Sequence, residues 1–284
     1  MTMADAPAGT AAAIKSMKLY SAVERIHLDL KAAGLGDEGP LDPTALSQFD
    51  QLHYHGTETV DRAIAELGIV EGACVLDVGA GFGGPARWIA AKSGAQVDAV
   101  ELQPDLHAAA ETLTARSGLA GKVVHHCADI LQTELDQGSY DAVVSWLTLY
   151  HIPDRAPLFP KLFAALRPGG GLYVEDLYAR GEPTAAEAET LREMLFSNTL
   201  PSEEAYRAEL AEAGFEAVVF EDQTDDWAAF TAARLEAFRA ARAEREAVYG
   251  AETTDALDAF YSTIASLLAG GRLGGVRLTA RRPD

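Results

Sequence analysis

The side chains best placed for chemistry stand where three short apolar runs end. The run at residues 74–78 leads into the glycine-rich segment 79–84, and such a turn lets a ligand approach the backbone closely. Asp77 stands near the end of the first run, where a carboxylate would repel a pyrophosphate and suits a cation better. Glu101 and Asp129 follow the next two runs and could bind ribose hydroxyls and an adenine amino group. This spacing predicts a nucleoside site that also accommodates a positive charge.

Strand and helix patterns alternate around these residues. Seven runs have the composition of strands, and they lie at residues 74–78, 96–100, 122–126, 140–146, 171–177, 215–221 and 273–281. Helical patterns precede or separate the first five runs, at residues 57–67, 85–93, 105–116 and 155–166. Such alternation predicts an α/β fold with a doubly wound, Rossmann-like, seven-stranded and mostly parallel sheet.

Helical segments outside this alternation predict a lid. We expect residues 1–56, with a helix over 16–35, to form an N-terminal helical lid. Residues 57–284 would form the ligand-binding domain, with helical insertions near 182–213 and 224–270. Because open sheets bind ligands outside the carboxyl ends of their strands, these helical pieces should cover that edge and decide specificity.

The composition narrows the possible partners. The chain has 284 residues with 43 Asp and Glu against 23 Lys and Arg, a net charge of −20, which argues against binding nucleic acid or an anionic membrane. No apolar stretch reaches the length of a membrane span, and the start shows no targeting pattern. Cys74 and Cys127 lie in apolar runs, so we expect buried thiols in a reducing compartment. We therefore expect a cytoplasmic enzyme with a small-molecule partner and no metal; a homodimer stays open.

Together, these motifs resemble those of the class I S-adenosylmethionine-dependent methyltransferases. The likeness covers roughly residues 57–281 and includes the stretch 77–83 (Asp-Val-Gly-Ala-Gly-Phe-Gly), Glu101, Ala-Asp-Ile at 128–130 and Leu-Arg-Pro-Gly-Gly at 166–170. The resemblance implies that Asp77 and the glycine turn hold the methionine part of the cofactor, Glu101 the ribose, and Asp129 with Ile130 the adenine. The implied cofactor contacts are Asp77, Gly79, Ala80, Gly81, Gly83, Glu101, Leu102, Gln103, Ala128, Asp129, Ile130 and Ser145.

Residues 81–87 and 145–151 are similar to one branch of that family, the sarcosine/dimethylglycine and phosphoethanolamine N-methyltransferases. In that branch a histidine stands at the position of His151, over the transferable methyl group, and an aromatic N-terminal segment closes the pocket. Residues 51–56 could do so here. A histidine with a pKa near 7 can take the proton of an ammonium acceptor, so His151 is the expected base.

Other site residues follow less directly. Tyr54 and His55 are further catalytic candidates, and which of them or His53 faces the substrate stays open. Arg87 could meet a carboxylate of the cofactor or substrate, or form a surface ion pair. The expected substrate contacts are Tyr20, His53, Trp146, Tyr150 and Arg87. The adjacent carboxylates of residues 175 and 176 are expected to face solvent rather than the substrate.

Three functions are compatible with these residues. The first is transfer of a methyl group from S-adenosylmethionine to a small amine of the glycine, sarcosine, dimethylglycine or phosphoethanolamine type, giving S-adenosylhomocysteine. The second keeps the cofactor but methylates a carbon acid or a hydroxyl in secondary metabolism. The third is an S-adenosylmethionine-binding protein without catalysis.

Overall fold

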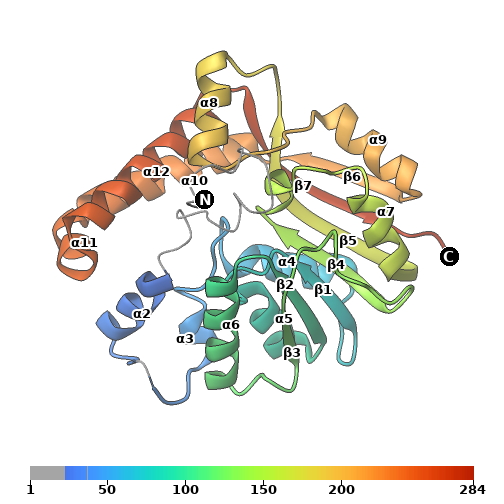
Figure 1. Ribbon diagram of the computed structural model, residues 1–284, viewed down its shortest axis with the longest axis horizontal. Coiled ribbons are helices and arrows are strands. Elements are labelled where there is room, and N and C mark those ends of the chain that lie inside the picture. Colours follow the sequence, from blue (N-terminus) through green and yellow to red (C-terminus); the bar gives the residue numbers. More distant parts are fainter. Residues whose placement is uncertain (1–22, 37) are drawn as a thin grey trace, which may run out of the picture.

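The computed structural model describes residues 23–36 and 38–284. A single seven-stranded sheet carries the fold, and helices lie on both of its faces (Figure 1). Its strands are β1 Cys74–Val78, β2 Gln96–Glu101, β3 Val123–Cys127, β4 Tyr140–Trp146, β5 Leu166–Ala179, β6 Glu216–Asp222 and β7 Leu273–Arg281.

The strand order is β3-β2-β1-β4-β5-β7-β6. The first five strands run parallel to one another, and β7 is antiparallel to both of its neighbours. This confirms the predicted mostly parallel, doubly wound sheet. The chain reverses its direction of travel across the sheet between β1 and β4, and a ligand is expected at their carboxyl ends.

Alternate residues of the central strands pack on opposite faces of the sheet. Leu76 and Val143 face the helices α7 Leu158–Ala165 and α9 Glu203–Ala213, whereas Val75 and Val144 face α4 Thr57–Leu67 and α5 Gly84–Ser93. Both faces of these strands are therefore buried, which explains their nearly continuous apolar sequences.

The remaining helices are mostly where the patterns place them. They are α2 Val23–Ala32, α3 Pro43–Leu46, α6 Pro104–Arg116, the 3-10 turn η1 Leu149–His151, α8 Ala185–Met194, α10 Thr224–Ala240, α11 Arg242–Tyr249 and α12 Ala251–Ala269. The helical insertion expected near 224–270 consists of three helices: α10 ends at Ala240, α11 begins after Ala241, and α12 follows it. No helix in the described part of the chain is long and apolar enough to cross a membrane.

The N-terminal segment packs on the sheet domain. Ile26 and Leu30 of α2 contact Leu106 and Leu113 of α6 in one buried cluster. The start of the helix expected over residues 16–35 lies outside the described residues. The part that is described forms a second layer beside α6 (Figure 1).

Two expectations about burial are wrong. Cys127 is exposed because it ends the edge strand β3, and Cys74, the first residue of β1, is only half-buried. Glu175 and Asp176 do not face solvent: they are 1% and 0% exposed, because β5 lies inside the sheet with its end covered. Glu175 pairs with Arg277 at 2.9 Å, and Asp176 accepts a hydrogen bond from the Tyr206 hydroxyl. Glu175 therefore joins β5 to β7, and Asp176 joins β5 to α9.

Candidate active site

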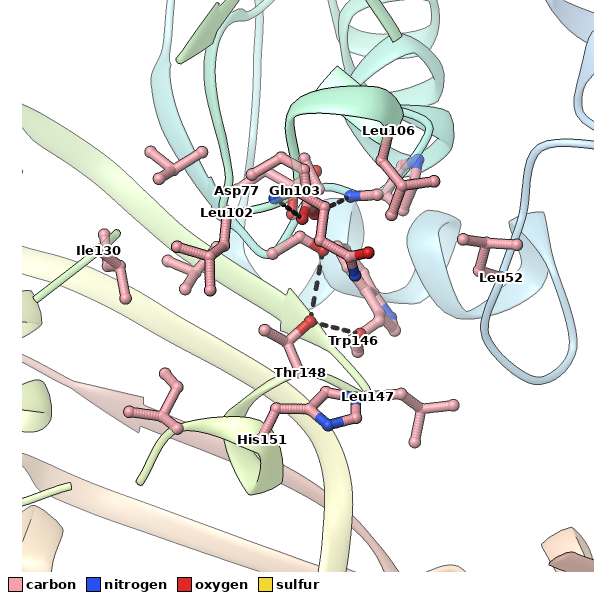
Figure 2. Close-up of a pocket in the computed structure, with 18 of the residues that line it drawn as sticks. Leu52, Asp77, Leu102, Gln103, Leu106, Ile130, Trp146, Leu147, Thr148 and His151 are labelled. Carbon is pink, nitrogen blue, oxygen red and sulfur yellow. Dashed lines mark hydrogen bonds between the residues drawn. The ribbon is translucent and has the colours of Figure 1, made fainter. Parts of the chain in front are cut away.

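A cavity lies at the carboxyl ends of β1, β2 and β4, where the sheet order places a ligand (Figure 2). It brings together thirteen of the residues expected in the site, namely His53, Asp77, Gly79, Ala80, Gly81, Glu101, Leu102, Gln103, Ala128, Asp129, Ile130, Trp146 and His151. The sequence did not single out the other lining residues, which are Asp50, Leu52, Val78, Pro85, Val100, Leu106, Leu131, Leu147, Thr148, Ile152 and Pro153.

The glycine turn lines this cavity with Gly79, Ala80 and Gly81. The N–H groups of Gly79 and Ala80 both donate to the carbonyl of Val100, at 2.9 and 3.1 Å, which fixes the turn against β2. Gly79 has a φ of +75°, and a Cβ there would lie 2.1 Å from Cγ2 of Thr148. The position therefore requires glycine for both conformation and space.

Asp77 carries an unused acceptor. Its side chain is 1% exposed, and Oδ2 has no hydrogen-bond partner among the described residues. Burial, reinforced by the charge of Glu101, raises the pKa of Asp77 to about 7. A buried carboxylate is costly unless a cation or donor compensates it, so this atom suits a positively charged ligand group.

Glu101 and Asp129 are held by backbone donors. Glu101 Oε2 accepts the N–H of Gly81 and Oε1 accepts that of Gln103, both at 2.8 Å. Burial raises the pKa of Glu101, while these N–H groups oppose the shift. Asp129 Oδ1 accepts the N–H of Leu131 at 2.9 Å. Both carboxylates are therefore fixed in orientation at the edge of the cavity.

His151 faces the cavity from the turn after β4, below Thr148 in Figure 2. Its Nδ1 lies 3.1 Å from the carbonyl of Phe196, a contact in which the ring nitrogen is the donor. Burial lowers the pKa of His151 to about 4, so the expectation of a value near 7 is wrong. The imidazole is neutral at physiological pH, and Nε2 is the nitrogen that can accept a proton.

The structure separates the three aromatic residues of the N-terminal segment. His53 lines the cavity, with its ring 5.4 Å from that of Trp146, and burial lowers its pKa to about 4. Tyr54 instead packs against Trp227 at 4.8 Å, and Nε2 of His55 lies 2.6 Å from Asp226. Tyr54 and His55 therefore do not line the cavity, which corrects their assignment as catalytic candidates.

Arg87 has a different partner from those expected. Its guanidinium pairs with Asp50 at 2.8 Å, and both side chains are at most 2% exposed. A further bond joins it to the Thr114 hydroxyl at 3.0 Å. The ion pair is thus buried, and Arg87 does not line the cavity; it fastens Asp50, which does.

Three other expected contacts, Ser145, Gly83 and Tyr150, do not line the cavity in the structure. The Ser145 hydroxyl donates to the carbonyl of Val78 at 2.8 Å, inside the sheet. Gly83 precedes α5, where a Cβ would lie 2.6 Å from the ring of His125. Tyr150 is buried in an apolar cluster, its ring centroid 4.0 Å from that of His151. Tyr20 lies outside the described residues.

Two lining residues show what sequence reasoning missed. Thr148 donates to the carbonyl of Trp146 at 3.1 Å, and its place just after β4 is the strand-end signal that could have found it. Leu52 packs over the glycine turn, 3.2 Å from where a Cβ of Gly81 would lie. Residues 51–56 were expected to close the pocket, but nothing local in the sequence marks Leu52 as the residue of this segment that lies over the glycine turn.

Comparison with known proteins shows that this chain is similar to methyltransferases. Residues 75–170 match the family model described as "Methyltransferase domain". Phosphoethanolamine N-methyltransferase 1 of Arabidopsis thaliana is 32% identical over 61% of this chain and 34% of its own length. The 27-O-demethylrifamycin SV methyltransferase of Amycolatopsis mediterranei is 29% identical over 80% of this chain and 84% of its own.

Among solved structures, phosphoethanolamine N-methyltransferase 2 of Haemonchus contortus, in complex with phosphomonomethylethanolamine and S-adenosylhomocysteine, has the same fold. The TM-score is 0.77 at 22% identity, over 83% of this chain and 55% of that one. The chain spans from about a third to about a half of the length of the curated relatives that it matches first.

Proposed function

We propose, from the premise that residues 75–170 are a methyltransferase domain in a fold of the class I S-adenosylmethionine-dependent methyltransferases, that this chain methylates a small organic molecule. The methyl donor would be S-adenosylmethionine and the product S-adenosylhomocysteine. The observation that carries the proposal is the unpartnered, buried Oδ2 of Asp77 beside the glycine turn.

The lining residues fit this cofactor. Asp77 would accept a hydrogen bond from the ammonium of the methionine part, which supplies the positive charge that its burial calls for. Glu101, held by two backbone donors, would accept the ribose hydroxyls. Asp129 and Ile130 would contact the adenine at the end of β3.

The bound cofactor supplies a methyl group on an electrophilic sulfonium. The chain's part is to hold the acceptor atom, the methyl group and the sulfur in line and to exclude water from them. An in-line displacement gains most of its rate from these two effects. Trp146 and His53 would form one wall of the acceptor side. His151 Nε2 would accept the proton of the attacking group, in a hydrogen bond that tightens as the acceptor gains positive charge.

Two acceptor classes have support. The relatives named as phosphoethanolamine N-methyltransferases favour an amine, our first choice from the sequence. The Amycolatopsis mediterranei relative, which matches over 80% of this chain and 84% of its own length, is named for methylation of an oxygen, and it favours a hydroxyl acceptor. An ammonium ion must lose its proton before it attacks, and a base whose conjugate acid has a pKa of about 4 removes that proton poorly. A hydroxyl or a neutral amine becomes acidic only as it attacks the methyl group, so the neutral His151 suits these acceptors better.

Calorimetric titration with S-adenosylhomocysteine tests the cofactor site. We expect binding by the wild type and at least a tenfold loss in Gly79→Ala, because the new Cβ would lie 2.1 Å from Thr148 and displace a lining side chain. Gly68→Ala is the matched control: Gly68 also has a positive φ, of 67°, but nothing lies within 4 Å. No binding by the wild type, or equal loss in both variants, would contradict the proposal.

His151→Asn separates a catalyst from a cofactor-binding protein. Asparagine can keep the donor to the Phe196 carbonyl but removes Nε2. We expect kcat to fall by about 100-fold, the lower range for general acid–base catalysis, with unchanged S-adenosylhomocysteine affinity. The wild-type pH profile should show no inflection near 6.5 from this group, because burial lowers its pKa to about 4. An unchanged kcat would remove His151 from the mechanism.

A further inference from the structure

A second cavity, of about 500 Å³, adjoins the first. It lies between α2 with residues 47–56 on one side and the helices α10, α11 and α12 on the other, which Figure 1 shows at the same end of the sheet. Leu52 and His53 line both cavities, so the two meet at this segment. A volume of this size holds a ligand of drug-like dimensions.

The cationic residues of this cavity have no anionic partner among the described residues. In the described part of the chain, every arginine but three bonds to a carboxylate or to a main-chain carbonyl. The three are Arg25, Arg234 and Arg245, and all of them line the second cavity. The protein has 43 acidic residues, so three unpaired arginines gathered in one cavity need an explanation.

Arg234 is the most constrained of the three. Its guanidinium lies over the rings of Tyr261, Tyr54 and Phe230, with centroids at 4.6, 5.2 and 5.7 Å. Its Nε is buried and has no hydrogen-bond partner among the described residues. The rings hold the guanidinium in place while leaving its N–H donors unused, and such a planar donor set matches a carboxylate or a phosphate.

The rest of the wall is largely aromatic. Phe49 and Phe82 line it from the sheet side, and Phe238, Phe260 and Tyr261 from the helical arm. Among the described lining residues the one carboxylate is Asp29, which accepts a hydrogen bond from the Tyr249 hydroxyl. Aromatic side chains bind the apolar surface of a ligand. A cationic ligand would be repelled by the three arginines, whereas an anionic one would be attracted.

We infer that the second cavity binds the methyl acceptor, and that this acceptor is an organic anion, a carboxylate or a phosphate ester, with an aromatic or otherwise apolar body. The inference rests on the proposed function for the presence of an acceptor. The anionic group would bind Arg234 among the rings, and the apolar body would extend past Leu52 and His53 toward the first cavity. A molecule the size of dimethylglycine would leave most of the aromatic wall without contact.

Four probes at saturating S-adenosylhomocysteine test this by calorimetry. They are 1-naphthoate and 1-naphthyl phosphate, which carry rings and an anion, 1-naphthylmethanol, which has the rings alone, and phosphoethanolamine, which has a phosphate without rings. We expect the two naphthyl anions to bind at least tenfold more tightly than either other probe. The tighter of the two shows whether the natural anion is a carboxylate or a phosphate.

Arg234→Met should remove at least tenfold of the affinity for the naphthyl anions and leave that for 1-naphthylmethanol unchanged, because methionine keeps an apolar stem in the wall. Arg239→Met is the matched control, since Arg239 is on the same helix but pairs with Asp258 outside the cavity. An unchanged thermal midpoint shows that Arg234→Met folds; if it does not, Arg234→Lys, which keeps the charge, should restore folding and part of the affinity.

Failure of this inference differs from failure of the proposed function. Equal binding of 1-naphthoate and 1-naphthylmethanol, tighter binding of phosphoethanolamine, or binding of no probe to protein that holds S-adenosylhomocysteine would overturn the acceptor class alone. A protein that binds 1-naphthoate through Arg234 but does not bind S-adenosylhomocysteine would refute the proposed function and leave an anion site.

Discussion

Arg87→Met is expected to lower the free energy of unfolding by about 3–5 kcal/mol, because it leaves the buried carboxylate of Asp50 without its cation. The Arg87 and Asp50 side chains are 1% and 2% exposed, so water cannot replace the lost partner. The main chain is equally constrained at this point: a Cβ on Gly84 would lie 2.4 Å from the carbonyl oxygen of Asp50. Urea unfolding without ligand measures the loss.

An exposed ion pair provides the control. Arg62 pairs with Glu66 and Glu221 at side-chain exposures of 33–41%, so Arg62→Met should cost at most about 1 kcal/mol. The double change Arg87→Met with Asp50→Asn should recover part of the loss, because it removes the stranded charge. If Arg87→Met costs no more than Arg62→Met, Asp50 has found another partner and the ion pair is not what fastens the N-terminal segment.

Asp77→Asn is expected to abolish measurable S-adenosylhomocysteine binding and yet stabilise the ligand-free protein at pH 8. The asparagine side chain has no charge for the ligand ammonium, which makes a loss of at least 100-fold reasonable for a buried charged hydrogen bond. It also removes the cost of ionising a buried carboxylate, which we estimate at about 2–4 kcal/mol from the pKa difference between folded and unfolded protein.

The sign of this effect follows from proton linkage. The pKa of Asp77 is about 7 in the folded protein and 3.8 in its ordinary state, so between these values the folded state binds more protons than the unfolded state. Its contribution to stability therefore falls as pH rises from about 4 to 7, and the full cost is present above pH 7. Below pH 4 the wild type and Asp77→Asn should be nearly equally stable.

The same titration governs ligand binding. Below pH 7 Asp77 is increasingly protonated, so wild-type affinity for S-adenosylhomocysteine should fall as pH decreases and level off above 7. Asp42→Asn is the control, because Asp42 caps α3 and asparagine caps equally well, so its affinity and stability should match the wild type. An Asp77→Asn protein that still binds the ligand would remove Asp77 from the cofactor site.

The sequence by itself determined the fold class and much of the cofactor side of the cavity. Asp77, the glycine turn, Glu101 and Asp129 all lie within a few residues of the end of a strand. Carboxyl ends of neighbouring parallel strands share one edge of the sheet, so residues found separately along the chain must meet there. Short, nearly continuous apolar runs were enough to place β1 and β4, because both faces of these strands are buried.

Only the tertiary structure decided which residues from distant segments reach the cavity. Whether His53, Tyr54 or His55 faces inward depends on how residues 50–56 turn against α10, and no local pattern encodes that contact. The pairing of Arg87 with Asp50 and the low pKa of His151 likewise depend on contacts between segments that are far apart in the sequence. Burial and partnership are set by side chains far apart in sequence, and they determine charge, proton affinity and cavity shape.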